Sequence, residues 1–120
     1  MSAAAPNIAP FNALILAAIR SSISEANALS DAHGMDEQGA EANAFRHLYA
    51  SCSLTRRVGA GEATLATSAH ETTAHSKGDD EQRDSNQDTA NNRKGIEFAS
   101  NSANKDQTCE SFALQGSRPE

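Results

Sequence analysis

Apolar side chains recur along most of this chain at intervals of three and four residues, which is the spacing of one face of an α-helix. The clearest case is the segment 8–29, whose apolar face contains Ile8, Phe11, Leu14, Ile15, Ala18, Ile19 and Ile23. The following segment, 30–34, has the composition of a loop, and Gly34 suits the end of a helix. Because no alternating strand pattern competes, the sequence predicts an all-α protein.

A second helix is predicted over 39–57, with apolar positions on two opposite faces. One stripe contains Phe45, Leu48, Tyr49 and Cys52, and the other contains Ala44, His47, Ser51, Leu54 and Val58. A helix that is covered on both faces belongs in the middle of a bundle. His47 would therefore point into the interior, where a polar side chain needs a partner.

Two more helices are predicted, over 62–76 and 83–100. The first follows a glycine-rich break and carries His70 in a line of alanines. The second places Asp84, Asp88, Asn91 or Asn92, and Gly95 on one face, where Gly95 would admit a neighbouring backbone or a ligand. We expect the polar segment 76–82, with its run of acidic residues, to be an exposed, mobile connection that acts as a flap over the site.

The remaining residues complete a compact bundle of four to five helices. Cys109, Phe112, Ala113 and Leu114 can dock as a short fifth helix, and 116–120 should be frayed. We therefore expect a single helical domain over 1–120, with its core at about 8–100 and a short docked helix and frayed tail at 101–120.

Charge and hydropathy narrow the possible partners. Ten Lys and Arg stand against 16 Asp and Glu, which gives a net charge of -6. This charge would repel a phosphate backbone, so a nucleic-acid partner is disfavoured, whereas a basic protein partner would be attracted. The most apolar stretch, 11–19, is shorter than the roughly 20 residues that cross a bilayer. We expect no membrane span and, without a basic region at the N-terminus, no classical secretory signal.

The two cysteines, Cys52 and Cys109, admit two interpretations. They would close a long loop in an oxidising compartment, or serve as small buried apolar groups in a reducing one. Because Cys52 falls on an apolar stripe, buried thiols are the preferred interpretation.

Four motifs in a fixed order resemble an uncharacterised bacterial domain family. They are Ala44-Phe45-Arg46-His47, Thr55-Arg56-Arg57-Val58-Gly59-Ala60, Ala69-His70-Glu71 and Asp88-x-x-Asn91-Asn92-x-x-Gly95. The chain departs from the pattern at Tyr49-Ala50, where an aromatic such as Trp is common, and in the acidic connection before Asp88. The resemblance implies a phage-related, secreted or toxin-associated protein, placed outside the cytoplasm by a non-classical route in preference to the cytoplasm.

Three residues from three predicted helices, His47, His70 and Asp88, form the sharpest candidate site. Two imidazoles and a carboxylate are a ligand set that leaves an open position on a catalytic zinc ion. Glu71 would then be the general base that takes a proton from water. His70 and His75 are five residues apart, so the zincin motif is excluded. The predicted cofactor is one divalent metal, with zinc preferred.

Two alternatives use the same part of the chain. In one, Arg46, His47, Glu71, Asp88 and Asn92 form a buried network with a purely structural role. In the other, His70 is the general base of a metal-free reaction and Arg46 stabilises an oxyanion. Arg46, Asn91 and Asn92 thus rank as supporting or substrate-binding residues, and His33 and His75 as surface histidines.

These residues predict a small, metal-assisted hydrolase that acts on a cell-envelope or other polymeric substrate, as an effector or phage-related protein. The alternative function is a non-enzymatic binding or adaptor module with a structural polar network. The sequence names no particular substrate and favours neither a monomer nor a dimer.

Overall fold

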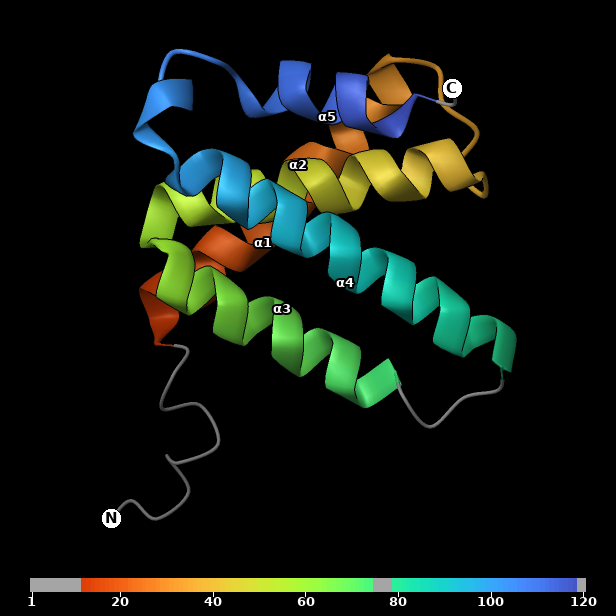
Figure 1. Ribbon diagram of the computed structural model, residues 1–120, viewed down its shortest axis with the longest axis horizontal. Coiled ribbons are helices and arrows are strands. Elements are labelled where there is room, and N and C mark those ends of the chain that lie inside the picture. The colour runs from red at the N-terminus through yellow and green to blue at the C-terminus, as the bar shows by residue number, and fades with distance from the viewer. Residues whose placement is uncertain (1–11, 75–78, 119–120) are drawn as a thin grey trace.

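Five α-helices make up the parts of the chain that the computed structural model describes, residues 12–74 and 79–118 (Figure 1). Side chains are described for 12–69 and 85–118. The helices are α1 (Ala13–Ala32), α2 (Ala40–Val58), α3 (Ala60–Ala74), α4 (Asp79–Ser100) and α5 (Cys109–Ser117), with a 3-10 turn at Ser102–Asn104. Since no strand occurs within these ranges, the prediction of an all-α bundle is confirmed.

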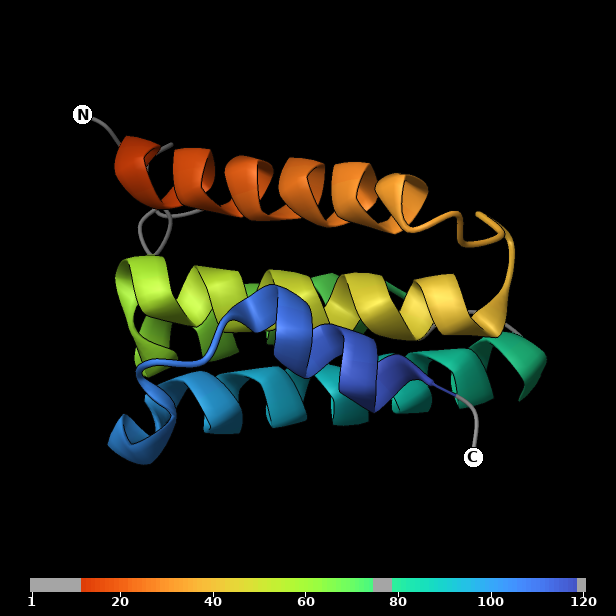
Figure 2. The ribbon, with the colours of Figure 1, turned by 90° about the horizontal axis from the view of Figure 1, so that it is seen from above.

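The central element is α2, which contacts all four other helices. Figure 2 shows α1 on one side of α2 and α4 on the other, while α5 covers a further side. Both predicted stripes of α2 contribute buried side chains, namely Phe45, Leu48 and Cys52 from one and Ser51 and Leu54 from the other. The prediction of a central helix over 39–57 is therefore confirmed.

The largest buried side chains lie between α2 and α5. Phe45, Leu48 and Ala113 form the centre of this cluster. The partly buried side chains around them are Leu29, Met35, Tyr49, Phe112 and Leu114. The core thus extends beyond the expected limit near residue 100. A frayed tail was expected from residue 116, but α5 continues to the buried Ser117, and Gly116 lets this helix approach Leu48 closely.

The helices α2 and α4 run in the same direction and meet in a regular register. Asn43 pairs with Asp88 and His47 pairs with Asn92, and the members of each pair are 45 residues apart. One turn further on, a Cβ atom added to Gly95 would lie 2.8 Å from the carbonyl oxygen of Leu48. The prediction that Gly95 admits a neighbouring backbone is confirmed, and the small residue fixes how closely the two helices approach.

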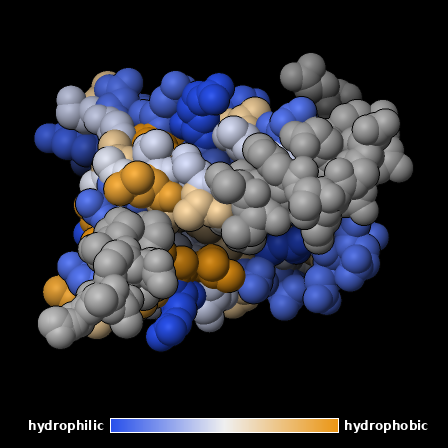
Figure 3. Space-filling model, turned by 90° about the horizontal axis from the view of Figure 1, so that it is seen from below, coloured by the Kyte–Doolittle hydropathy of each residue, from blue (hydrophilic) through white to orange (hydrophobic). Residues whose placement is uncertain are grey.

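The buried side of α1 is narrower than its apolar pattern predicts. Small residues one turn apart, Ser22, Ala26 and Ser30, form the buried line, whereas Ile23 is 50% exposed and Leu14 is 81% exposed. Small side chains let α1 lie close to α2, so the larger apolar residues of α1 lie at the edge of the interface between the two helices. Figure 3 shows hydrophobic side chains at the surface on one face of the molecule.

Two helix ends differ from the sequence predictions. The segment 30–34 was expected to be a loop, but α1 continues to Ala32 and ends before Gly34, whose φ is 72°. The acidic run Asp79-Asp80-Glu81 was expected to be a solvated loop, but α4 already begins at Asp79. Carboxylates stabilise the first turn of a helix through its dipole, which explains this earlier start. His75 and the rest of 75–78 lie outside the described residues, and so does this part of the predicted flap.

The predicted absence of a membrane span holds for the described part of the chain, where no helix is long and apolar enough to cross a bilayer.

Candidate functional site

A chain of four polar side chains joins α2 to α4. Asn43 Nδ2 donates a hydrogen bond to Asp88 Oδ1 at 2.7 Å, and Asp88 Oδ2 lies 3.4 Å from His47 Nε2. The other ring nitrogen, His47 Nδ1, lies 3.0 Å from Asn92 Oδ1. The side chains of His47 and Asp88 are 21% and 18% exposed, and Asn92 is 6% exposed. Two of the predicted metal ligands therefore do lie together at the interface.

The hydrogen bonds restrict what the two ligand candidates can do. Because an amide oxygen only accepts, the contact with Asn92 Oδ1 assigns a proton to His47 Nδ1. In the neutral ring, the lone pair is then on Nε2, which points at Asp88. Asn43 occupies Asp88 Oδ1, so Oδ2 remains for another partner. The pair thus presents one nitrogen and one oxygen donor to the same region.

The separation of these two atoms is compatible with a shared cation. Ligand atoms about 2.0–2.1 Å from a tetrahedral zinc ion are roughly 3.3 Å apart, close to the 3.4 Å between His47 Nε2 and Asp88 Oδ2. In metal sites, ligand side chains are oriented by hydrogen bonds to outer residues, and Asn92 and Asn43 make contacts of this kind with His47 and Asp88. A direct ion pair between a protonated His47 and Asp88 fits the same distance. Among the side chains described, no group of three His, Cys, Asp or Glu residues converges as a metal site.

The remaining predicted site residues are placed as follows. His70 and Glu71 belong to α3, but their side chains lie outside the described set. Arg46 donates to the carbonyl oxygen of Glu37 at 3.3 Å, so no hydrogen bond ties it to the His47 and Asp88 pair. Asn91 is 3% exposed and its Nδ2 has no hydrogen-bond partner among the described residues. Only His47, Asp88 and Asn92 of the predicted group are therefore seen to be joined.

Asn43 was missed by the sequence analysis, although a signal for it exists. It precedes His47 by four residues, just as Asp88 precedes Asn92 by four. Two polar pairs with the same helical spacing can meet rung by rung when their helices run in the same direction. The helical repeat does not reveal that direction, so it did not predict Asn43.

A pocket of about 250 Å³ adjoins the polar chain, between α1, α2 and α3. His47 and Asn92 are part of its wall. The rest of its described lining is mostly apolar or small: Ile19, Ser22, Ile23, Ala26, Asn27, Arg46, Ala50, Ser51, Leu54, Ala66 and Thr67. The His47 site is thus reachable from a largely apolar space, as in many small-molecule sites.

A second polar cluster connects α1 to α2 and shares only Ser22 with the described lining of this pocket. Arg57 donates to Glu25, to Ser22 Oγ and to Ser53 Oγ, and Tyr49 also donates to Glu25. The hydrogen bond from Arg57 lowers the pKa of Glu25 below its ordinary value of 4.5. Burial, with help from Glu25, raises the pKa of Tyr49. Because every one of these groups is paired with another, the cluster is a structural clasp between two helices.

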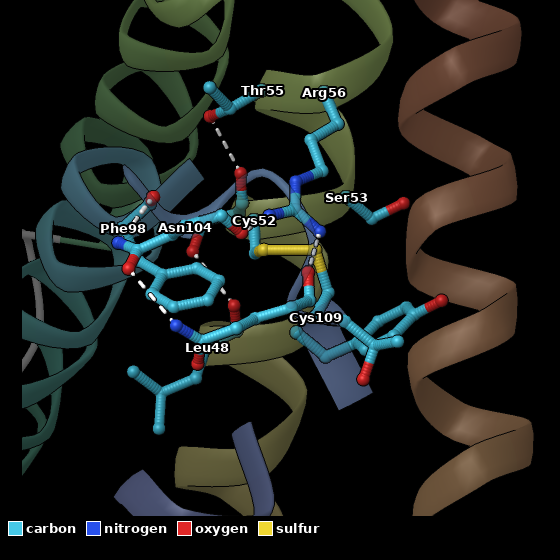
Figure 4. The surroundings of a disulfide bond; sticks show 12 residues. Leu48, Cys52, Ser53, Thr55, Arg56, Phe98, Asn104 and Cys109 are labelled. Atoms are coloured by element: carbon cyan, nitrogen blue, oxygen red, sulfur yellow. Dashed lines mark hydrogen bonds between the residues drawn. A yellow bond between two sulfur atoms is a disulfide. The ribbon is translucent and has the colours of Figure 1, made fainter. Parts of the chain in front are cut away.

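The preferred interpretation of the cysteines as thiols is wrong, because Cys52 and Cys109 form a disulfide (Figure 4). Their Cα atoms are 5.7 Å apart, which is the usual spacing for such a bond. An apolar stripe accommodates a buried disulfide as well as a buried thiol, so the pattern around Cys52 did not discriminate between them. The bond ties α5 to α2 across 57 residues of sequence.

Arg56 and His33 support the same region. The Arg56 guanidinium donates to the carbonyl oxygens of Asn104 and Gln107 and lies over the ring of Phe98, which stacks on Phe112. His33, expected at the surface, is exposed and lies 2.7 Å from a carboxylate oxygen of Glu110. The segment after α4 is therefore held by several side chains in addition to the disulfide.

Comparisons with known proteins give one match. No curated protein and no solved structure matches the chain. The model of a single family, described as a domain of unknown function (DUF6973), matches residues 8–116. This range covers α1 to α4, all of α5 except its last residue, and both partners of the disulfide. The chain therefore belongs to the DUF6973 family.

Proposed function

We propose that this protein is a small metal-assisted hydrolase that acts on a cell-envelope or other polymeric substrate. In this proposal His47, His70 and Asp88 bind one divalent ion, preferably zinc, and Glu71 is the general base. The observation that carries the proposal is the pair of possible ligand atoms His47 Nε2 and Asp88 Oδ2, which lie close together. Asn92 contacts the other ring nitrogen of His47, and Asn43 donates to the other carboxylate oxygen of Asp88, so both side chains are held in place. This is the arrangement that orients ligands for a metal.

The third ligand is proposed from the course of α3. Ala66 and Thr67 line the same pocket as His47, and His70 follows Ala66 by four residues in the same helix. Residues four apart share a helix face, so the backbone of His70 continues the line that borders the pocket. A zinc ion held there would polarise a water molecule or a substrate carbonyl. Glu71 would take the proton from that water.

The disulfide supports an extracytoplasmic location for this activity. Structural disulfides persist in oxidising compartments and are rare where thiols are kept reduced. Cys52 is fully buried and Cys109 is 8% exposed, so the bond is part of the core. We propose that the protein works outside the cytoplasm, consistent with a secreted, effector or phage-related role.

The second candidate function is a binding or adaptor module, in which the polar chain is structural. It is favoured by the contacts among Asn43, Asp88, His47 and Asn92, which a protonated His47 completes as a direct ion pair with Asp88. In that case, the net charge of -6 on the whole protein would attract a basic protein partner.

Elemental analysis of tag-free protein, purified without chelator, tests the metal proposal. We expect close to one zinc ion per chain and a melting temperature that rises when zinc is added. The His47→Ala and His70→Ala double variant should lose both properties, whereas His33→Ala, a change at a histidine on the opposite side of α2 from the pocket, should keep them. A wild-type protein without metal, whose melting temperature does not respond to zinc, would refute the metal site and leave the adaptor function.

A further inference from the structure

The pocket beside His47 has a polar end and an apolar end. The helices α1 and α2 run in opposite directions, since Ser22 pairs with Ser53 and Glu25 with Tyr49. This register places Ile19 and Leu54 at one end of the pocket. The other end receives Asn27, Arg46 and His47. Ser22, Ser51 and Thr67 also line the pocket, but their hydroxyls donate to other protein atoms, so a ligand that fills the pocket should be apolar along its length and polar at the end next to His47.

Charge at the pocket differs from charge over the chain as a whole. The chain has a net charge of -6, yet none of the described lining residues is Asp or Glu. Arg46 is the only Lys or Arg among them. Its guanidinium has five N–H donors, and the hydrogen bond to Glu37 uses one of its nitrogen atoms. The polar end therefore favours a carbonyl or carboxylate oxygen over a cationic group.

The volume sets the size of the apolar part. A cavity of about 150 Å³ with apolar walls is enough for benzene, so about 250 Å³ accommodates a longer group. The apolar side chain of Ile23 lines the pocket and is half exposed. Exposed apolar surface of this kind gains free energy when a ligand covers it, by about 25 cal/mol per Å². An aliphatic chain of medium length meets both conditions.

We infer that this pocket binds the aliphatic chain of an acylated molecule, with the acyl oxygen atoms toward Arg46 and His47. The inference rests on the proposed function for its chemistry and names the substrate class of that hydrolase as acyl esters or amides. Hydrolysis would break the bond between the acyl carbon and the leaving oxygen or nitrogen. Water would supply the hydroxyl group to the acyl carbon and a proton to the leaving group.

Calorimetric titration with octanoate tests the binding step without any need for turnover. We expect binding to octanoate, and about tenfold weaker binding to hexanoate, because each buried methylene contributes about 0.8 kcal/mol. Octylamine has the same number of carbon atoms but a cationic end, and should bind more weakly than octanoate. Arg46→Gln should weaken octanoate binding about tenfold and should not weaken octylamine binding, because it removes a positive charge that repels the ammonium group. Titration with octanoyl lipid in micelles separates a free acid from an acylated lipid as the source of the chain.

Matched variants locate the ligand. Ala66→Phe fills the pocket from α3 and Ile23→Asn removes apolar surface from α1, so each should weaken octanoate binding at least tenfold. Leu65→Asn is the control, because Leu65 is also 50% exposed but does not line the pocket. Circular dichroism confirms that each variant is folded. Equal effects of Ile23→Asn and Leu65→Asn, or no binding of octanoate by the wild type, would overturn the inference.

The two proposals can fail separately. His70→Ala removes a proposed metal ligand but leaves the described pocket walls intact, so it should lose zinc and hydrolysis while it still binds octanoate through Arg46 and the apolar walls. Binding of octanoate by a protein that contains no metal would sustain the pocket and refute the hydrolase mechanism. A zinc-containing protein that binds neither octanoate nor octanoyl lipid would sustain the metal site and refute the acyl-binding pocket.

Discussion

On its α5 side, α2 presents Phe45, Leu48 and Cys52, which are buried against a cross-linked helix. On the side of α1 and α3, it presents Arg46, His47 and Ala50, which border a pocket. One side combines apolar packing with a covalent bond, and the other has small side chains and a polar chain. The contrast indicates that the α5 side provides the stability that permits an open, polar site on the other side.

Among the changes that test this contrast, removal of the disulfide should cause the largest loss in the free energy of unfolding. The double variant Cys52→Ala and Cys109→Ala loses a bond across 57 residues, which corresponds to about 4 kcal/mol in the chain-entropy model. Urea denaturation, followed by circular dichroism, measures the loss as a lower midpoint. Reduction of the wild type should give a similar midpoint. A loss below about 1 kcal/mol would show that apolar contacts alone hold α5.

Gly95→Ala should cause the next largest loss in the free energy of unfolding, because the added methyl group pushes α2 and α4 apart. The new Cβ would lie 1.9 Å from Ser51 Oγ and 2.8 Å from the backbone oxygen of Leu48. Overpacking of this kind costs about 2–3 kcal/mol in the free energy of unfolding. Gly61→Ala in α3 is the control, since no atom lies within 4 Å of its added Cβ. That variant should match the wild type or gain up to about 1 kcal/mol.

Asp88→Ala removes one member of the polar chain, and we expect a smaller loss of about 1–3 kcal/mol. Asn43 and His47 would both lose their contact with this carboxylate. Glu97→Ala, an exposed carboxylate on the same helix, should change stability by less than about 0.5 kcal/mol. Thermal melts of the two variants, compared without added metal, make the measurement. Equal melting temperatures would mean that the polar chain contributes nothing to the fold.

The smallest effect is expected at Glu25. Its folded-state pKa is lowered by Arg57, so its contribution to stability is present above the ordinary value of 4.5 and is lost as pH falls through the folded-state pKa. The Glu25 side chain is 42% exposed, so water screens the ion pair and Glu25→Gln should cost about 0.5 kcal/mol at pH 7. The difference between the two proteins should vanish in acid. A difference that persists below the folded-state pKa would contradict the assignment to this pair.

Helical periodicity predicted α2 well but did not identify its partners. The positions of Phe45, His47 and Leu48 follow from a 3.6-residue repeat. The same repeat does not reveal that α2 and α4 run in the same direction, which brings Asn43 to Asp88. For α1 the pattern was misleading, because Ser22 and Ala26 are more deeply buried than Ile23. Close helix contact favours small side chains, and a count of hydrophobic residues does not register this preference.

The candidate site was predicted in part for the same reason. His47 was named from its place on an apolar stripe, and Asp88 and Asn92 from a polar line along one helix face; the structure brings these three together. The pocket could not be predicted, because it depends on how closely α1 approaches α2. The disulfide could not be predicted either, since no periodic signal links residues 57 apart.

The common direction of α2 and α4 has a consequence for synthesis on the ribosome. The contact between Ser22 and Ser53 spans 31 residues and is available as soon as α2 has emerged. His47 must wait for Asn92, 45 residues later, which takes about 2 to 9 s at 5–20 residues per second. During that time the half of the chain that holds α1 and α2 can pair without the polar site. The nascent protein thus acquires a scaffold before it acquires the residues that His47 contacts.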